Sequence, residues 1–336
     1  MENPDGNPLP SDMRDLQNTL LGRYQIQKLL GRGGMGEVYL AQDTMLKRAV
    51  ALKRLRPDRE HSQEESQRIL REAQAASKLS NPRIAAVYDV LKHQGEVFLV
   101  MEYVDGTSLR DLLLDSPGNP LPLDRFFDIA NQCVQAFDAA HTAGLVHQDI
   151  KPDNIMVMDS GQIKILDFGL AVKVSSEDDL RTLSTETFHE RESGGTPSYM
   201  APEAILGRTL DRRADIYSLG VTFYELLARE RPFTKDSDVS LVDQVLHHDP
   251  IPLTKIREDI PEGLASVVQR MMAKDPEARY ASARDMLKDL VAAEQGENLS
   301  TGAQRSMVQK ESFWKSRTGA VVFALAGLIL FTLWSR

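Results

Sequence analysis

Cysteine is nearly absent from the chain, since Cys133 is the single one among 336 residues. One cysteine excludes an internal disulfide framework and fits a reducing compartment. Cys133 lies in a stretch with helical apolar spacing, from Phe126 to Ala140. We therefore expect it to be a small buried hydrophobic residue and not a reactive thiol.

Positive charge is in deficit, because 40 Lys and Arg residues stand against 49 Asp and Glu residues, a net charge of -9. This balance argues against nucleic-acid binding as the main function, since neutralising phosphates needs an excess of Lys and Arg. It does not bear on ATP binding, which needs only a few local cations.

The N-terminus lacks the pattern of a secretory signal, which is a basic segment followed by an apolar run. Met1 to Asp15 is acidic and rich in Pro, Gly and Asn instead. We expect residues 1–22 to form a disordered leader.

Long uncharged apolar runs are absent until the C-terminus, where one extends from Thr318 to Trp334. At a rise of about 1.5 Å per residue, this segment is just long enough to cross a membrane as a helix. Trp314 and Trp334 flank it like interfacial anchors, and three cations precede it: Lys310, Lys315 and Arg317. The charge bias predicts that the main part of the protein faces the cytoplasm. We expect a flexible linker over residues 294–317, a transmembrane helix over 318–334, and no external sensor domain.

The character of the sequence changes near residue 104. Before it, strand-like alternation occurs in four places, together with one stretch of helical spacing at Gln63–Leu79. The strand patterns cover Arg23–Leu40 (two strands around a glycine loop), Arg48–Leu55, Ile84–Leu91 and Val97–Tyr103. After it, helical patterns dominate, at Leu109–Leu114, Leu123–Ala143, Asp215–Ala228, Ser240–His247, Gly263–Ala273 and Ala283–Ala293. The sequence thus predicts an α+β protein with a small β-rich part, 23–104, and a larger helical part, 105–293.

A glycine loop, Gly31-x-Gly33-x-x-Gly36, lies between the first two predicted strands. Such a loop lets backbone N–H groups approach phosphates, but the same spacing occurs in dinucleotide-binding turns. A dinucleotide site should open a helix and carry an acidic residue about twenty positions later. Here a strand follows the loop, and Lys53 stands at that distance. The pattern therefore favours a nucleotide-phosphate site.

Lys53 has apolar neighbours in its strand, Val50-Ala51-Leu52-Lys53. We expect its ammonium group to point into a cleft and to need an acidic partner there. Glu72, in the predicted helix, can supply that carboxylate. From the sequence alone, Glu72 can equally pair with Arg68 on the helix surface.

The strongest signal is His147-Gln148-Asp149-Ile150-Lys151-Pro152-Asp153-Asn154, followed after two short predicted strands by Asp167-Phe168-Gly169. The two strands are expected at Ile155–Met158 and Gln162–Leu166. This spacing predicts that Asp149, Asn154 and Asp167 meet at one cleft. Phosphoryl transfer needs a carboxylate to accept the substrate hydroxyl proton, together with oxygen ligands for Mg²⁺.

With these motifs in order, the chain from about Tyr24 to Ala292 resembles the eukaryotic-type (Hanks-type) Ser/Thr protein kinase family. The resemblance implies a bilobal protein-kinase fold and transfer of the ATP γ-phosphate to protein Ser and Thr hydroxyls, with autophosphorylation. It implies that Asp149 is the catalytic base and that Lys151 stabilises the transferred group. Lys53 would bind the α- and β-phosphates, and Glu72 would pair with Lys53. Asn154 and Asp167 would bind Mg²⁺, with Mn²⁺ as an alternative. The nucleotide would be contacted by Leu30, Gly31, Gly33, Gly34, Gly36, Val38, Ala51, Lys53, Met101, Glu102, Val104 and Met156.

The same resemblance assigns roles outside the cleft. Ala201-Pro202-Glu203 would close the activation segment, with Glu203 paired to Arg279, and Asp215 would brace the catalytic loop. Lys151 and Thr196 match the Ser/Thr branch. Two sequence segments, Arg71 to Ala76 and Val100 to Gly106, most resemble those of bacterial members, many of which are tethered by one membrane helix. This likeness implies signalling at a bacterial inner membrane; dimerisation through the small lobe or the membrane helix stays open.

One residue departs from the family pattern, because Gln148 stands where the family usually has Arg. That Arg pairs with a phosphate on the activation segment, and a neutral amide cannot form the ion pair. We hypothesise that phosphorylation of this segment is not strictly required for activity. Its acceptors are Thr182, Ser184, Thr185 and Thr187, while Arg68 or Lys173 remain alternative phosphate partners.

Two other functions compete with this interpretation. A membrane-bound pseudokinase scaffold would typically lack Lys53, Asp149 or Asp167, and all three are present. A small-molecule kinase of related fold generally lacks the Ala-Pro-Glu motif and a peptide-facing residue like Thr196. Both features favour a protein substrate.

Overall fold

A computed structural model describes residues 16, 18–33, 36–55, 73, 77, 79–94, 96–115, 120–168, 196–234 and 239–297. Several predictions lie outside these ranges: most of the leader, Gly34, the partner carboxylate Glu72, the activation-segment acceptors, most of the linker and the segment Thr318–Trp334. Within the described part of the chain, no helix is long and apolar enough to span a membrane.

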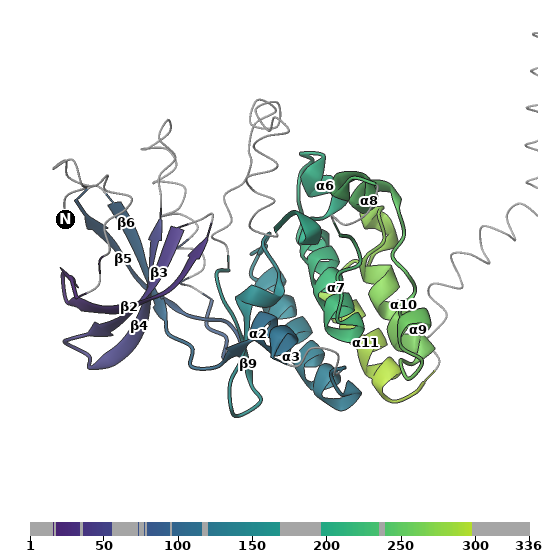
Figure 1. Cartoon of the computed structure of the whole chain (residues 1–336), viewed down its shortest axis with the longest axis horizontal. Helices are drawn as coiled ribbons and strands as arrows, with labels where there is room; N and C mark the ends of the chain where they lie inside the picture. Colours follow the sequence, from purple (N-terminus) through teal and green to yellow (C-terminus); the bar gives the residue numbers. More distant parts are fainter. Residues whose placement is uncertain are drawn as a thin grey trace, which may run out of the picture.

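The small lobe is one antiparallel sheet with the strand order β1-β2-β3-β4-β6-β5 (Figure 1). Its strands are β1 (Leu20–Leu21), β2 (Tyr24–Gly33), β3 (Gly36–Asp43), β4 (Arg48–Leu55), β5 (Val87–His93) and β6 (Glu96–Glu102). Side chains alternate between the two faces of each strand, and the apolar ones on one face of β2, β3, β4 and β6 form a buried core. This core includes Tyr24, Tyr39, Leu52 and Phe98. The strand predicted at Arg48–Leu55 is β4, and its bounds match the prediction.

The predicted leader is too long by at least two residues. Leu20–Leu21 forms strand β1 and pairs with β2, with Leu21 opposite Tyr24. Leu21 is buried in the sheet core, and Leu16 packs against the same core. A two-residue strand has too little alternation to be read from sequence; its stability comes from this packing.

The large lobe is mainly helical, as predicted. Its helices are α2 (Leu109–Leu114), α3 (Leu123–Thr142), α6 (Pro202–Ile205), α7 (Arg212–Ala228), α8 (Leu241–His247), α9 (Leu253–Ile256), α10 (Glu262–Met271) and α11 (Ala283–Glu294). Helix α7 is buried on nearly all sides, and α3, α10 and α11 pack with it in one large core. Cys133 is fully buried in this core, as expected.

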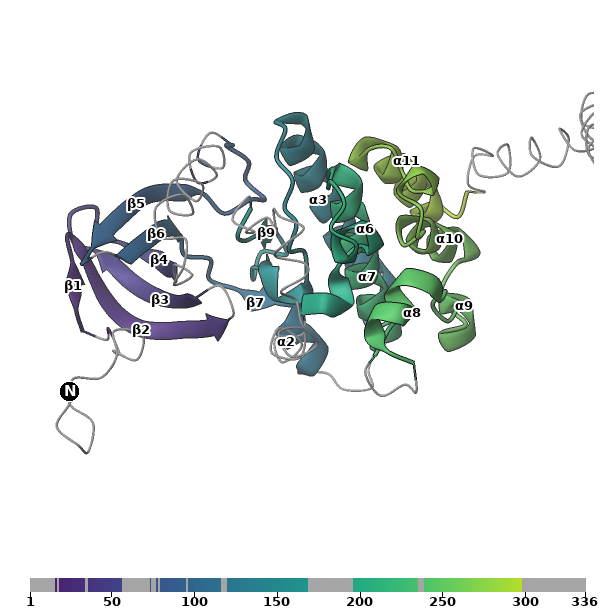
Figure 2. The same ribbon diagram turned by 90° about the horizontal axis from the view of Figure 1, so that it is seen from above.

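A second small sheet lies where the lobes meet, with the strand order β7 (Thr107–Ser108), β8 (Ile155–Val157) and β9 (Ile163–Ile165). The chain crosses between the lobes just before β7 (Figure 2). Gly106 lies so close to β8 that a Cβ atom there would approach the Val157 carbonyl oxygen to 2.6 Å. A parallel bridge between Ile84 and Ile165 joins the lobes a second time. The bridge holds the end of β9 beside residues 83–85, the segment that precedes β5 in the small lobe.

Candidate active site

The glycine loop is the turn of the β2–β3 hairpin, and Figure 2 shows this end of the hairpin directed toward the large lobe. Gly31 lies opposite Val38 and Gly33 opposite Gly36. Gly36 has a φ of 131°, a conformation that side chains with a Cβ rarely adopt, so a glycine is needed here. Leu30, which precedes the loop, is partly exposed at 42%. The described residues at this end of the hairpin therefore include an exposed apolar side chain, that of Leu30, and a glycine that its backbone conformation requires.

Lys53 extends from β4 between Val38 on β3 and Leu99 on β6. Its side chain is only 5% exposed, and its Nζ atom lies 2.9 Å from Oδ2 of Asp167. The sequence predicted a buried ammonium with an acidic partner, but did not pair it with Asp167. The predicted pairing with Glu72 lies outside the described residues. Ala73, the residue after Glu72, is helical and is buried against side chains of β4 and β6.

Three residues predicted to contact the nucleotide, Val38, Ala51 and Met101, lie on the same side of the small sheet. Ala51 and Met101 are buried in one apolar cluster, and Val38 packs against it. Met156 lies on β8, opposite Ser108 and Lys164 in the second sheet. Val104 is nearly buried, and its backbone N–H and C=O groups have no hydrogen-bond partner within the described residues. Since buried backbone groups normally have partners, Val104 offers one donor and one acceptor to a flat polar ligand.

Glu102, one of the residues predicted to contact the nucleotide, is occupied by contacts within the protein. Its carboxylate lies 2.6 Å from Nζ of Lys164 on β9, and it accepts a hydrogen bond from the Ala86 N–H. Its own N–H donates to the Ala86 carbonyl oxygen. The side chain of Glu102 thus ties the two lobes together and is not directed to a ligand.

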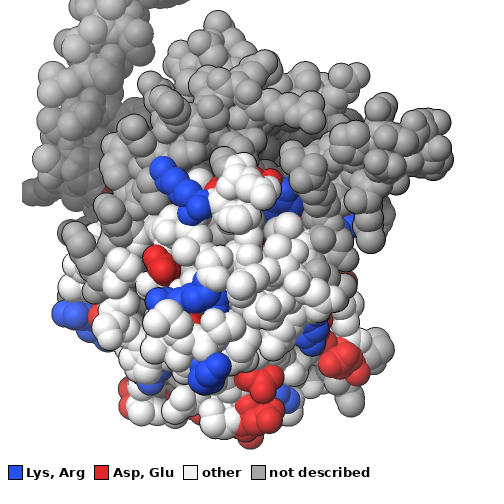
Figure 3. All heavy atoms as spheres, turned by 90° about the vertical axis from the view of Figure 1, so that its left-hand side faces the viewer, with Lys and Arg blue, Asp and Glu red and all other residues white. Residues whose placement is uncertain are grey.

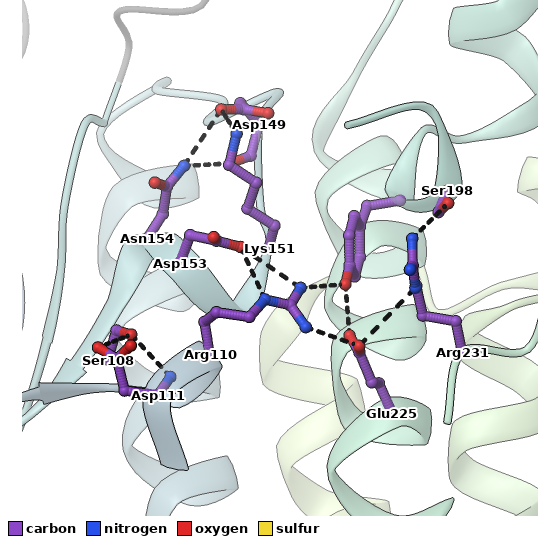
Figure 4. Close-up of polar contacts among 11 residues, drawn as sticks. Ser108, Arg110, Asp111, Asp149, Lys151, Asp153, Asn154, Ser198, Glu225 and Arg231 are labelled. Carbon is purple, nitrogen blue, oxygen red and sulfur yellow. Dashed lines mark hydrogen bonds and ion pairs between the residues drawn. The ribbon is translucent and has the colours of Figure 1, made fainter. Parts of the chain in front are cut away.

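The predicted catalytic loop brings Asp149, Lys151 and Asn154 together (Figure 4). Lys151 Nζ lies 2.9 Å from Asp149 Oδ2, and Asn154 Nδ2 donates to the same oxygen at 3.2 Å. Asn154 Nδ2 also donates to the Asp149 backbone carbonyl at 2.8 Å. A short 3₁₀ turn, Pro152–Asn154, closes this arrangement. The Asp149 side chain is 10% exposed, so a carboxylate with an adjacent cation is held at the surface of the cleft.

Asp215 at the start of α7 braces the loop from beneath, as predicted. Its Oδ2 atom accepts the N–H of His147 and its Oδ1 atom accepts the N–H of Gln148, both at 2.8 Å. The Oδ2 atom also lies 2.8 Å from Nε2 of His141. Gln148 has a φ of 68°, and these hydrogen bonds hold its backbone in that uncommon conformation.

Asp167 follows β9 with a φ of 60°, which turns its carboxylate toward Lys53. The loop around it is fixed to the catalytic loop, because the Leu166 N–H donates to the Asn154 carbonyl at 2.8 Å. Phe168 is buried against His147 and Phe137. One backbone hydrogen bond therefore joins Asn154, a predicted metal ligand, to Leu166, the residue before the other predicted ligand, Asp167.

Asp167 fits a metal ion better than it fits a purely structural role. Its Oδ2 atom is paired to Lys53, but its Oδ1 atom is buried and has no hydrogen-bond partner in the described part of the protein. A buried carboxylate oxygen without a partner is costly unless a ligand satisfies it. No group of three or more His, Cys, Asp or Glu residues suited to a metal occurs among the described residues. One carboxylate and one amide suit Mg²⁺, which keeps several waters and takes phosphate oxygens as further ligands.

The buried pair predicted between Glu203 and Arg279 is confirmed. Arg279 Nη1 and Nη2 donate to the two carboxylate oxygens of Glu203 at 2.6 and 2.8 Å. Arg279 also donates to the backbone carbonyls of Ala273, Lys274 and Arg213. The pair therefore joins α6 to the segment between α10 and α11.

One polar cluster beside the catalytic loop was missed by the sequence reasoning. Arg110 on α2 binds Glu225 on α7 through Nη1 at 2.8 Å, and its Nη2 donates to the Tyr199 hydroxyl at 2.5 Å. Its Nε and Nη2 atoms lie 3.4 Å from Asp153 Oδ2. Burial opposes the charge, but the hydrogen bonds and charge interactions with Glu225 and Tyr199 together outweigh it and raise the pKa of the Arg110 guanidinium. Burial, followed by the Glu225 charge, raises the pKa of the Tyr199 hydroxyl. No local pattern reveals residues that are 115 positions apart.

The charged side chains at the small-lobe end of the molecule are of both signs and interspersed (Figure 3). Arg54 on β4 is one of the few that are buried there, and it pairs with Glu37 on β3 and Glu96 on β6. Its contacts hold three neighbouring strands together. The described part of this face therefore carries charges of both signs.

Comparison with known proteins identifies what this arrangement resembles. Residues 24–291 match the family model described as "Protein kinase domain". The chain is 39% identical over 282 residues to serine/threonine-protein kinase PknB of Mycobacterium tuberculosis, and 37% identical over 272 residues to serine/threonine-protein kinase PrkC of Bacillus subtilis. These alignments cover 83% and 81% of this chain, but only 44% and 40% of the two relatives. A crystal structure of the M. tuberculosis PknI kinase domain has a TM-score of 0.66 with 29% identity, and the match covers 83% of this chain and 98% of the PknI chain.

Proposed function

This chain belongs to the protein kinase family, and from that premise we propose that it transfers the γ-phosphate of ATP to Ser and Thr hydroxyls of proteins. The observation that carries the proposal is that two ion pairs, Asp149 with Lys151 and Lys53 with Asp167, belong to loops joined by the hydrogen bond from the Leu166 N–H to the Asn154 carbonyl. The names of the relatives support the choice of Ser and Thr.

We propose that the nucleotide lies between the glycine loop and β8. The apolar surface of Val38, Ala51 and Met101 would pack against the adenine ring, and the backbone of Val104 would hydrogen-bond its edge. Lys53 is placed to bind the phosphates, since its ammonium is buried and has an acidic partner on one side only among the described residues. In this proposal Glu102 contributes backbone, because its side chain binds Lys164.

Asn154 and Asp167 are the residues we propose as metal ligands. Mg²⁺, or Mn²⁺ as an alternative, would when bound neutralise charge on the phosphates during transfer. The unpartnered Oδ1 atom of Asp167 supports this role. The amide of Asn154 already donates to Asp149, so its carbonyl oxygen is the atom that would bind the metal.

Asp149 is the group we propose to receive the substrate proton. Its Oδ2 atom accepts hydrogen bonds from Lys151 and Asn154, so the carboxylate is held in one orientation. A Ser or Thr hydroxyl that donates to Asp149 would be oriented for in-line attack on the γ-phosphate. Lys151 lies next to the same oxygen, where its positive charge would stabilise the negative charge of the transferred group.

Phosphorylation of a mixture of unrelated proteins by the full chain in detergent, with Mg-ATP, tests this function. We expect phosphate on Ser and Thr only, mapped by mass spectrometry, and a rate at least about 100-fold lower for Asp149→Asn, the range lost with a general base. Phosphotyrosine as the main product, or an Asp149→Asn variant as active as the wild type, would contradict the proposal.

The membrane tether is a separate part of the proposal. We propose that Thr318–Trp334 spans a bacterial inner membrane once and that the preceding residues lie in the cytoplasm, where the protein signals and autophosphorylates. The apolar composition of this segment and the cations that flank it support the proposed span. The full chain should stay in the membrane pellet after an alkaline wash, and a chain that ends at Ser312 should appear in the supernatant. Equal release of the two chains would sink this part of the proposal and leave the catalytic part standing.

A further inference from the structure

The Arg110 cluster lies on the side of the catalytic loop that faces α7 and the segment Thr196–Tyr199. Figure 4 shows the Arg110 guanidinium between Asp153 on the loop and Glu225 on α7. Asp153 is four positions after Asp149 on the same loop. Ser198 and Tyr199 belong to the segment just after Gly194-Gly195. A peptide that presents a hydroxyl to Asp149 would therefore pass close to Asp153, the cluster residue on the same loop.

Charge within the cluster is balanced inside the chain. Glu225 is 7% exposed in its side chain, and it accepts hydrogen bonds from Arg110 and from the Tyr199 hydroxyl. Arg231 lies further away, with its Nε atom 4.0 Å from Glu225 and its Nη1 atom donating to Ser198 at 3.3 Å. Asp153 is 48% exposed, and its contacts with Arg110 are long. Arg110 is thus the cation that satisfies both carboxylates.

We propose that Arg110 determines substrate specificity by filling, from within the chain, a two-carboxylate site that would otherwise bind a basic side chain of the protein substrate. The inference rests on the proposed kinase function. A guanidinium presents several N–H donors in one plane, so one arginine can contact Glu225, Tyr199 and Asp153 together. While Arg110 is in place, a substrate arginine finds no unsatisfied carboxylate among the described residues of this cluster. The wild-type enzyme therefore has no preference for a basic residue at this position.

Removing Arg110 should uncover that preference. Arg110→Met keeps an unbranched apolar stem, removes the guanidinium and leaves Glu225 buried without its main cation. A buried carboxylate without a cation is strongly unfavourable, so an arginine from the peptide would regain the lost interaction. A hydrogen bond to a charged group contributes enough to correspond to roughly tenfold or more in kcat/KM.

The test uses the full chain in detergent and a set of alanine-rich peptides with one Ser. Each peptide carries a single Arg at one position between four residues before and four after the Ser. For each position, the readout is the ratio of kcat/KM for the Arg peptide to that for the all-Ala peptide. We expect ratios near one for the wild type, and a ratio of roughly ten or more at one position for Arg110→Met. Adding Glu225→Gln to Arg110→Met should return that ratio to near one.

Controls separate this role from a structural one. Arg284→Met breaks an exposed arginine–aspartate pair with Asp138 in the helical lobe, and should keep the wild-type ratios. A cluster that only braces the fold would lower kcat/KM equally for every peptide. If Arg110→Met does not fold, Arg110→Lys is the second variant. Its ammonium cannot span all three partners, so one ratio should rise by about threefold.

An active Arg110 variant with ratios near one at all positions overturns this inference and leaves the proposed function intact. A wild type that phosphorylates none of the peptides, nor any protein in the mixture, overturns the proposed function and this inference with it. The two failures are therefore distinguishable.

Discussion

At the scale of single residues, Gln148 is the position where this chain departs most clearly from its family. Its backbone N–H is held by Asp215, and its φ of 68° is fixed in the catalytic loop. The side chain makes no hydrogen bond within the described residues. The backbone function of this position is therefore retained, while the cation that usually stands there is replaced by a neutral amide.

Loss of this cation predicts an enzyme that does not depend on phosphate in its activation segment. Alanine at Thr182, Ser184, Thr185 and Thr187 together should leave kcat toward an added protein within about threefold of the wild type, since no ion pair to Gln148 is lost. The initial rate of phosphorylation measures this. A loss of activity in the quadruple variant, with normal folding, would show that another cation binds the phosphate.

Asp215 illustrates how one buried carboxylate can control the site without touching substrate. Its two oxygens accept two backbone N–H groups of the catalytic loop. In Asp215→Asn one acceptor becomes a donor that faces an N–H group, which costs about 1 to 3 kcal/mol. We expect lower stability by that amount and a kcat at least about tenfold lower, because Asp149 is misoriented. Denaturant unfolding and steady-state kinetics check both, and an unchanged kcat would contradict the bracing role.

At the scale of elements, α7 organises the large lobe. Its residues from Ala214 to Leu227 are buried almost without interruption, so it lacks an exposed polar face. Gly220 lies where α7 meets the end of α10. A Cβ atom at Gly220 would be 2.8 Å from Cβ of Met271 and 2.9 Å from Cγ of Met272. The contact between the helices thus depends on the missing side chain.

Gly220→Ala should therefore destabilise the protein, although alanine is the better helix former. The gain in helix propensity is about 1 kcal/mol, whereas overpacking a core costs roughly 1 to 3 kcal/mol. We expect the free energy of unfolding to fall by about 1 kcal/mol in urea titrations. A variant that is as stable as the wild type, or more so, would mean that α10 moves away without cost.

Most of the regular elements could be predicted from the sequence, because their own periodicity marks them. Helix α2 and strand β4 have the predicted bounds, and Ser108 caps the start of α2 by accepting a hydrogen bond from the Asp111 N–H. The short helices α6 and α9 were not predicted. Each has four residues, which is too few for a periodic pattern, and each is held by packing against the large core.

The candidate site likewise has a part that the sequence predicts and a part that it does not. Asp149, Lys151 and Asn154 lie close together in sequence, so their meeting follows from a local turn. The pairing of Lys53 with Asp167 and the contacts of Arg110 join distant parts of the chain. Only the folded lobes bring those residues together, so sequence spacing alone could not identify them as partners.

At the scale of the whole molecule, Lys274 links stability to pH. Burial lowers the pKa of its ammonium to about 8, against an ordinary value of 10.5. Its Nζ atom donates to the Val245 carbonyl at 2.8 Å and lies 4.1 Å from the centre of the Phe233 ring. Below a pH of about 8 the folded protein must hold a charge in this poorly solvated place. The resulting free-energy penalty on the folded state declines as the pH rises from about 8 toward 10.5, the ordinary pKa that the lysine has in the unfolded chain.

This linkage predicts that the wild type gains stability relative to Lys274→Met as pH increases. Between about pH 7 and about pH 9 the unfolded state binds more protons at this position, so the free energy of unfolding should rise by about 1 kcal/mol relative to the variant. Urea titrations at the two pH values measure the difference. A constant difference would show that the lysine titrates normally.

The central claim is that Lys53, Asp149 and Asp167 form one phosphoryl-transfer centre. Intact-mass spectrometry of the full chain after incubation with Mg-ATP tests it most directly, with Lys53→Met and Asp167→Asn beside the wild type. The account predicts that the wild type gains phosphate, mapped to Ser or Thr, and that neither variant does. If a folded variant gained as much phosphate as the wild type, or if the wild type gained none while still binding ATP, the account would be contradicted.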